Sequence, residues 1–530
     1  MNRYTPRRRT RRRSLAITVL LALIPLVLVA CGGSSQPAVD TGSAASGTPK
    51  DGGTLTYDAF SEINSWKVNQ LEDQNGGEDR GDFVYDTLLI DTASGGWTPN
   101  IATSMTTSND VTWTMKLHPD VKFTDGTPLN AAAVVWNVKF LLDPANAFGD
   151  LGEISVIKSV TAVNATTVQF VLSRPSGSLP LVFGSLPGMM MSPTAYQKNP
   201  AAFGNDPVGA GPFMVKSFVR NSETILTRNP HYWDAPKPYL NQVDIKIVTD
   251  PTVRAEDLES GQADLVANQS QVQAIVQNNP NLTIFTKVDD GAEAFVPNQN
   301  IAPFNDLQIR EAMTIGWNYA TVDSYLEQGA WPQKSFDCPP FSTVQPECAS
   351  GAWPKTSITK AKQLVQQYVS AGHKLGTYTL LTNTGRVPEA QLIQQEMSAI
   401  GINLKIESVP NAEFVTLLNK GSFQVAYNGV TPFIGVPWNF LRNIDCQQRH
   451  AQQGPCDSKL ETAILQAEYG VTAAQRTAAE KTIQQVNATE FDYDWFAPSP
   501  GGLAGQKYVE LGPRYPGAST MVAQDIWLNK

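Results

Sequence analysis

The sequence predicts an α/β protein that divides into two or three lobes. Residues 378–406 carry the clearest local pattern: apolar residues alternate as in a strand, recur at helical spacing from Pro388 to Ile400, and alternate again after Gly401. A strand, helix and strand in this order are the unit that builds α/β sheets. The chain has 530 residues, 42% of them hydrophobic, which is enough for several cores. No repeat of fixed period is present, which argues against solenoids and propellers.

The first 30 residues have the pattern of an export signal. Seven arginines precede Ser14, and an apolar run broken only by Thr18 and Pro25 covers residues 15–30. The run is short for a membrane span and lacks a basic flank behind it, so we expect a signal peptide, residues 1–30, that is removed. The arginine pairs before Ser14 also resemble a twin-arginine signal, so the sequence leaves Sec and twin-arginine export both open.

Cys31 stands directly behind the apolar run. Together with Leu28, Val29 and Ala30 it resembles a bacterial lipobox, in which the cysteine is acylated and becomes the new N-terminus. We therefore expect lipid attachment at Cys31, and the alternative is a cysteine at the edge of an ordinary signal peptide. Residues 31–50 are mostly small and polar and predict a flexible tether.

Structure is expected to begin with a strand near Gly53, because Leu55 and Tyr57 alternate with threonines. A second strand is predicted where Trp113, Met115 and Leu117 alternate with polar residues. Asp125 and Gly126 then supply turn residues, and a helix is expected from about Ala131.

The net charge of the chain restricts which partners it can bind. The formal net charge is −9, and without residues 1–30, which carry seven basic and no acidic residues, it becomes −16. A strongly acidic surface argues against nucleic acid as a partner.

Four further cysteines form two pairs, each ten residues apart: Cys338 with Cys348, and Cys446 with Cys456. In an exported chain they predict two short local disulfides. The sequence does not fix the connectivity, because four cysteines allow three pairings. Zinc binding is the alternative, although these gaps do not match the short CxxC spacing of zinc sites.

Motifs of catalysis are missing from the sequence. The histidines are isolated and form no HExxH pair, and GxSxG and P-loop patterns do not occur. The glycines at 209 and 211 lack the third glycine of a dinucleotide loop. We therefore predict a binding protein without catalytic activity, metal or cofactor; a hydrolase that assembles its residues from distant positions is the alternative.

Two long stretches resemble family 5 extracellular solute-binding proteins, the dipeptide-, oligopeptide- and nickel-binding group of ABC transporters. The first, residues 99–144, carries the signature pattern of the family at these positions: Trp113, Lys116, Leu117, Val121, Lys122, Phe123, Asp125, Gly126, Pro128, Leu129, Ala131 and Val134. The second, residues 206–266, resembles the middle segment of the family in order and spacing. A third stretch from Pro303 extends the likeness over nearly all of residues 53–500.

The resemblance implies an α/β, bilobed periplasmic-binding-protein-like fold of type II, cluster C, with a hinge between the lobes. By analogy, lobe I would consist of residues 51–88, 206–288 and 497–530, with an inserted subdomain at 89–205, and lobe II of residues 289–496. The ligand would be enclosed between the lobes.

The resemblance also implies a place and partners for the protein. It would be a monomeric bacterial lipoprotein, anchored through Cys31 on the extracytoplasmic face of the membrane, that delivers peptides or similar small solutes to an ABC permease with its ATPase. The alternatives are an exported hydrolase and a lipoprotein that uses the same fold without transport. The sequence does not name the ligand.

We expect these residues to contact the ligand: Asp58, Phe60, Asn298, Asn300, Tyr427, Asn428, Trp438 and Phe440. Residues 426–441 resemble the stretch in which peptide-binding members often place an acid for the α-amino group, yet no Asp or Glu occurs there. Hydrogen bonds and aromatic faces remain, which favour a neutral or blocked ligand, a sugar-like solute, or a peptide held by its backbone. The alternative is an acid from another segment, such as Asp58 or Glu62.

Overall fold

The structure is a computed structural model. It describes residues 47–71, 76–92, 96–148, 151–267, 270–285, 291–326, 354–430, 458–491, 494–499, 502–515 and 521–530. The predictions for the signal peptide, the five cysteines, Trp438 and Phe440 fall outside these residues.

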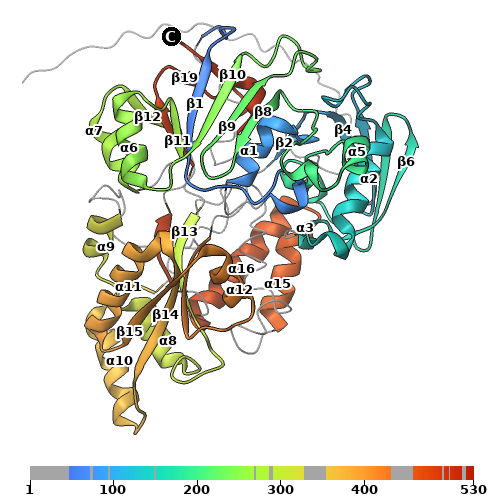
Figure 1. The fold of residues 1–530 in the computed structure, drawn as a ribbon. Coiled ribbons are helices and arrows are strands. Elements are labelled where there is room, and N and C mark those ends of the chain that lie inside the picture. Colours follow the sequence, from blue (N-terminus) through green and yellow to red (C-terminus); the bar gives the residue numbers. More distant parts are fainter. Residues whose placement is uncertain are drawn as a thin grey trace, which may run out of the picture. The chain divides into compact units, whose positions relative to one another are not determined.

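The first sheet has seven strands in the order β12-β18-β11-β1-β10-β9-β8 (Figure 1). Its strands are β1 (Thr54–Ala59), β8 (Phe213–Val219), β9 (Glu223–Arg228), β10 (Gln242–Ile247), β11 (Leu265–Ala267), β12 (Leu282–Ile284) and β18 (Leu503–Gln506). Strand β1 is parallel to both of its neighbours, β10 and β11, and the remaining pairs are antiparallel. The predicted strand at Leu55 and Tyr57 is confirmed, and both side chains are buried.

The helices associated with this sheet are α1 (Gly77–Val84), α6 (Pro251–Ser260) and α7 (Ser270–Asn278). Helix α6 begins behind Asp250, whose carboxylate accepts the Thr252 backbone N–H at 2.8 Å, and ends at Gly261, which has a φ of 79°. The short elements of this region are η1 (Val68–Gln70), β2 (Leu89–Asp91), β3 (Trp97–Pro99), β19 (Val509–Glu510), η7 (Ala523–Asp525) and β20 (Trp527–Leu528).

The second sheet is antiparallel, with the order β4-β5-β7-β6. It is built from β4 (Ala102–Thr107), β5 (Thr112–Leu117), β6 (Ile157–Asn164) and β7 (Thr167–Leu172), and helix α2 (Ala131–Leu142) contacts β6 and β7. The strand predicted at Trp113 and the helix predicted from Ala131 are both confirmed. Asn130 caps α2, because its side chain accepts the Ala133 N–H at 3.1 Å.

Short helices complete the chain around the second sheet: η3 (Pro144–Asn146), α3 (Leu151–Ile154), α4 (Leu179–Val182), η4 (Leu186–Gly188), α5 (Pro193–Lys198) and η5 (Ala202–Gly204). The first and second sheets share one hydrophobic core, to which Leu55, Met115 and Phe213 all belong.

The third sheet has five strands in the order β15-β14-β16-β13-β17 (Figure 1). They are β13 (Gly291–Pro297), β14 (Thr377–Asn383), β15 (Asn403–Val409), β16 (Val425–Val430) and β17 (Asp494–Ser499). Helix α11 (Val387–Ile400) joins β14 to β15, which pair in parallel. It has a proline in its first turn and ends at Gly401, with a φ of 96°, so the predicted strand–helix–strand unit is confirmed.

Helices pack on both faces of the third sheet: α8 (Leu307–Ile315), α9 (Tyr319–Leu326), α10 (Ile358–Ser370), α12 (Asn411–Asn419), α15 (Ser458–Tyr469) and α16 (Ala473–Glu490). Alternate strand residues enter two separate cores. Phe295 and Tyr427 face the core shared with α8, α10 and α11, whereas Ala294 and Ala426 face the core of α12, α15 and α16. Among the described residues, no helix is both long and apolar enough to span a membrane.

Candidate ligand-binding site at the carboxyl edge of the third sheet

The order of strands in the third sheet marks one edge as a binding position. After β14 the chain passes through α11 to β15 on one side, whereas after β16 it leads on to β17, which lies beyond β13 on the other side. Strands β14 and β16 are adjacent and parallel, so their following connections leave in opposite directions. In open α/β sheets, ligands bind at the carboxyl ends of strands at such a switch point.

Three polar side chains meet at this edge. Arg386 belongs to η6 (Thr384–Arg386), directly after β14; Tyr427 lies on β16; and Glu293 lies near the start of the antiparallel strand β13. The Arg386 Nη1 donates to Glu293 Oε2 at 2.8 Å and to the Tyr427 hydroxyl at 3.2 Å. The Tyr427 hydroxyl in turn donates to the same carboxylate oxygen of Glu293.

Two of the three side chains in this cluster, those of Glu293 and Tyr427, are buried. The side chain of Glu293 is 8% exposed and that of Arg386 is 36% exposed, so the acid is buried while the guanidinium reaches solvent. The attraction of Glu293 raises the pKa of Arg386, which stays charged. Burial, followed by repulsion from Glu293, raises the pKa of Tyr427 far above its usual value, which keeps the hydroxyl protonated as a donor. A charge-assisted, bidentate-capable guanidinium is therefore held in a fixed orientation.

Glu389, in the first turn of α11, is the second acid near this arginine. Burial raises the pKa of Glu389 most, and repulsion from Glu293 adds to this; its own backbone N–H and Arg386 act in the opposite direction. The Glu389 Oε2 is buried and has no hydrogen-bond partner among the described residues. Tyr325 of α9 donates its hydroxyl to the Pro388 carbonyl at 2.8 Å and so fixes the start of α11.

The sequence-predicted residues of the first sheet have other contacts. Asp58 is 1% exposed, and its carboxyl group faces that of Asp257 on α6. Glu62 forms an ion pair with Arg80 at 3.2 Å and accepts the Asn221 N–H at 2.7 Å. Phe60 is half-buried at the end of β1. The ligand-binding roles of Asp58 and Phe60, and that of Glu62 as an alternative acid, stay predictions.

The sequence-predicted residues of the third sheet differ from one another in their surroundings. Asn298 is buried and shapes a turn, because its Nδ2 donates to the carbonyls of Gly421 at 3.2 Å and Phe423 at 2.9 Å. Asn300 is exposed beside it. Tyr427 belongs to the cluster, and Asn428 follows it on β16, paired with Ala294. Trp438 and Phe440 lie outside the described residues.

Sequence reasoning missed Glu293, Arg386 and Glu389. One signal was present: Arg386 directly follows a predicted strand and precedes a predicted helix, which is where switch-point residues lie in α/β sheets. Glu293 had no such signal, because its position depends on how β13 pairs with β16. The structure thus places a carboxylate beside Tyr427, from a segment that the sequence did not suggest.

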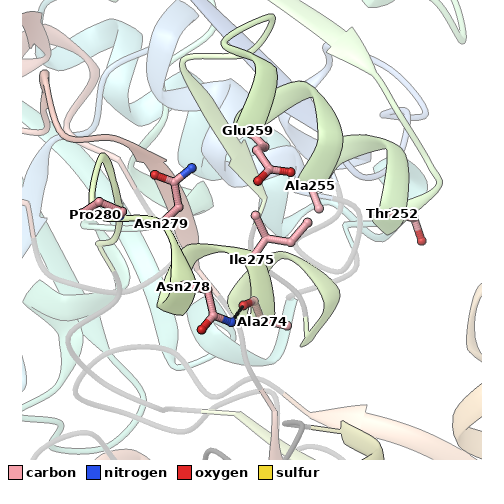
Figure 2. Close-up of a pocket in the computed structure, with 8 residues that line it drawn as sticks. All are labelled: Thr252, Ala255, Glu259, Ala274, Ile275, Asn278, Asn279 and Pro280. Atoms are coloured by element: carbon pink, nitrogen blue, oxygen red, sulfur yellow. Dashed lines mark hydrogen bonds between the residues drawn. The ribbon is translucent and has the colours of Figure 1, made fainter.

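Two further features of the described residues bear on ligand capture. No group of three or more His, Cys, Asp or Glu residues there could hold a metal ion. A hollow of about 690 Å³ is lined by residues of α6 and α7, among them Ala255, Ile275 and Asn278. Figure 2 shows these side chains. Asn278 donates one N–H to the Ala274 carbonyl of its own helix at 2.9 Å.

The fold and this edge define the class of α/β periplasmic-binding-protein-like proteins. Over 91% of this chain, the fold matches the periplasmic binding protein DppA from Helicobacter pylori, solved with the peptide STSA, with a TM-score of 0.76 and 21% identity; 99% of that chain is covered. The murein tripeptide binding protein MppA of Escherichia coli gives a TM-score of 0.77 at 17% identity, covering 92% of this chain and all of the other. The predicted fold class is confirmed.

Residues 96–451 match the family described as bacterial extracellular solute-binding proteins, family 5. The chain belongs to this family. Among its relatives are the glutathione-binding proteins GsiB of Shigella flexneri and of Escherichia coli strain K12, each 28% identical over 319 residues. These matches span 58% of this chain and 60% of the relatives' own length.

Proposed function

We propose that this protein is the substrate-binding component of an ABC importer, which captures peptides or similar small solutes outside the cytoplasm and passes them to a membrane permease. Family membership and the peptide- and glutathione-binding relatives support the proposal. The observation that carries it is Arg386, held by Glu293 and Tyr427 at the switch point of the third sheet. Its charge and fixed orientation suit an anionic group of a ligand, such as a carboxylate.

The proposal includes the two lobes that the family resemblance implies. Residues 51–88, 206–288 and 497–530, with the insertion at 89–205, would act as one body, and residues 289–496 as the other. The ligand would make more contacts with the closed arrangement of the two bodies than with the open one. This difference would shift the equilibrium between the two arrangements toward the closed one.

Replacing Arg386 by glutamine should weaken peptide binding at least tenfold, because the anionic group loses its charged partner. Calorimetric titration with a panel of di-, tri- and tetrapeptides and glutathione measures this. The control is Lys360→Gln, which removes an exposed ion pair with Glu311 on the same lobe. A wild-type protein that binds no member of the panel would refute peptide capture, and equal affinities of both variants would exclude Arg386 from the site.

Lipid anchoring at Cys31 is part of the same proposal, supported by the pattern from Leu28 to Cys31 behind the apolar run. Changing Cys31 to serine should release the protein from the membrane fraction, because no acyl chain then holds it. Fractionation after a high-salt wash tests this, since salt removes proteins held only by charge. Retention of the serine variant would mean that the leader itself is the anchor.

The cysteine pairs Cys338–Cys348 and Cys446–Cys456 should form disulfides, because each closes a short loop in an oxidising compartment. Non-reducing peptide mapping should recover each pair as one linked peptide. A link between Cys338 and Cys446 or Cys456, or four free thiols, would contradict this pairing.

A further inference from the structure

The chain passes between the first and third sheets at one place. It leads from β12 to β13 through residues 285–290, and from β17 back to β18 through residues 500–502. Strands β12 and β18 are neighbours in the first sheet, and β13 and β17 are neighbours in the third. The two bodies of the proposed function are therefore covalently joined where these strands end. Any further contact between the bodies, away from this joint, restricts the angle at which they meet.

A contact of this kind joins residues 174–178, which follow β7 of the second sheet, to the end of α15 beside the third sheet. The Ser178 hydroxyl donates to the Glu468 carbonyl at 2.6 Å. The Ser176 and Ser178 hydroxyls lie 3.0 Å apart, and both serines are buried. The two serines thus form one hydrogen-bonded group that ends on the backbone of the other body.

The residues around this hydrogen bond are closely packed. The Gly177 backbone lies so near the Val471 carbonyl that a Cβ added at Gly177 would collide with it. The Arg174 guanidinium lies over the Tyr469 ring, 5.1 Å from the ring centroid. Tyr469 also packs against the hydrophobic core that the first and second sheets share. The end of α15 and the turn after it are therefore fitted to the other body over several consecutive residues.

The polar groups of this contact can be separated at low cost. Hydroxyl, carbonyl and guanidinium groups bind water when they part, so separation leaves none of them without a hydrogen bond. The core shared by the first and second sheets differs, because separation would expose its apolar side chains to water. The contact between residues 174–178 and 468–471 therefore has the chemistry of one that is made and broken.

We propose that residues 174–178 and 468–471 form a latch, which is made when a ligand closes the two bodies and is broken when they open. The proposal rests on the proposed function, because closure around a ligand is part of it. The latch stabilises the closed arrangement without contacting the ligand, so it raises the affinity for different ligands by the same factor. It controls the residence time of the ligand and not the choice of ligand.

Ser178→Ala should weaken peptide binding about three- to tenfold, because the closed arrangement loses one buried hydrogen bond. Calorimetric titration measures this with the two peptides of the panel that bind the wild type most tightly, and both should lose affinity by the same factor. The matched control is Ser185→Ala, which removes another buried hydroxyl from the same insertion, where it donates to the Val182 carbonyl at 3.1 Å. The control should bind both peptides like the wild type.

Gly177→Ala tests the close packing. The new methyl group keeps the two segments apart, so the variant should bind about tenfold more weakly or worse. Its complex with saturating peptide should stay more expanded in small-angle X-ray scattering than that of Ser185→Ala. The ligand-free variant should unfold at the wild-type temperature, because the three atoms nearest to the added Cβ all belong to Val471, which lies in the other body.

The outcomes separate the latch from the proposed function. Unchanged affinity of either Ser178→Ala or Gly177→Ala overturns the latch and leaves the importer function intact. Tighter binding by either variant also overturns it, because the contact would then belong to the open arrangement. The same holds for an equal loss in Ser185→Ala, or for a loss that affects one peptide and not the other. Failure of the wild type to bind any peptide of the panel overturns both.

Discussion

Replacing Asp525 by alanine should lower the free energy of unfolding by about 3–5 kcal/mol, the usual cost of removing one partner from a buried ion pair. Asp525 is 3% exposed and receives two hydrogen bonds from Arg514, at 2.7 and 2.8 Å. Lys237 pairs with the same carboxylate at 3.0 Å. The variant would leave two cations facing each other without an acid between them, so the loss includes their repulsion.

Chemical denaturation followed by tryptophan fluorescence measures this loss. Asp51→Ala is the matched control, because Asp51 also pairs with an arginine, Arg228, but its side chain is 72% exposed. An exposed pair contributes about 0–1 kcal/mol, so the control should unfold close to the wild type. Similar losses in the two variants would show that burial adds nothing to the Asp525 network.

Asp58→Asn should stabilise the protein by about 2–4 kcal/mol at alkaline pH. Burial, and then the hydrogen bond and repulsion of Asp257, raise the pKa of Asp58 from 3.8 to about 7, while Lys246 and Arg254 oppose the shift. Both carboxylate oxygens of Asp58 lack another partner among the described residues. Ionised Asp58 therefore destabilises the folded state, and asparagine, which has no charge, removes this destabilisation.

The direction in which Asp58 changes stability with pH follows from the protons bound by the folded and unfolded states. The unfolded chain releases the Asp58 proton near pH 3.8, whereas the folded protein retains it until about pH 7. Between these values the folded state binds more protons, so wild-type stability falls as pH rises and the full loss is reached above pH 7. Asp58→Asn removes this contribution.

Urea unfolding at pH 5 and pH 8.5 provides the measurement. The stability difference between Asp58→Asn and wild type should grow between the two values. Asp257→Asn should reduce the wild-type loss as well, because its amide can donate to the Asp58 carboxylate. Asp51→Asn serves as the control for an acid-to-amide change at an exposed side chain. A constant difference between Asp58→Asn and wild type at both pH values would contradict the raised pKa.

Local patterns predicted much of the fold because they depend on neighbours in sequence. The periodicity around α11 and its end at Gly401 were both visible, since a helix face and a cap are set within a few residues. The alternation of Trp113, Met115 and Leu117 predicted β5 for the same reason.

The candidate site was visible only in part, because tertiary pairing builds it. Glu293 is 93 residues from Arg386 and 134 residues from Tyr427 in sequence, and their contact depends on the register of β13 against β16. The sequence predicted Tyr427, which carries a polar group in the expected stretch. It could not predict that a buried acid from another strand would stand beside it.

The position of β18 in the first sheet determines when this sheet can form during synthesis of the chain. This strand, Leu503–Gln506, lies between β11 and β12, although both of these precede it by more than 200 residues. A ribosome that has synthesised every residue before Leu503 has therefore not yet delivered a strand from the interior of this sheet. Until then, β11 and β12 present unpaired backbone edges, which are the surfaces that aggregate. The sheet is completed only after Gln506 has been synthesised, so the growing chain exposes these strand edges until then.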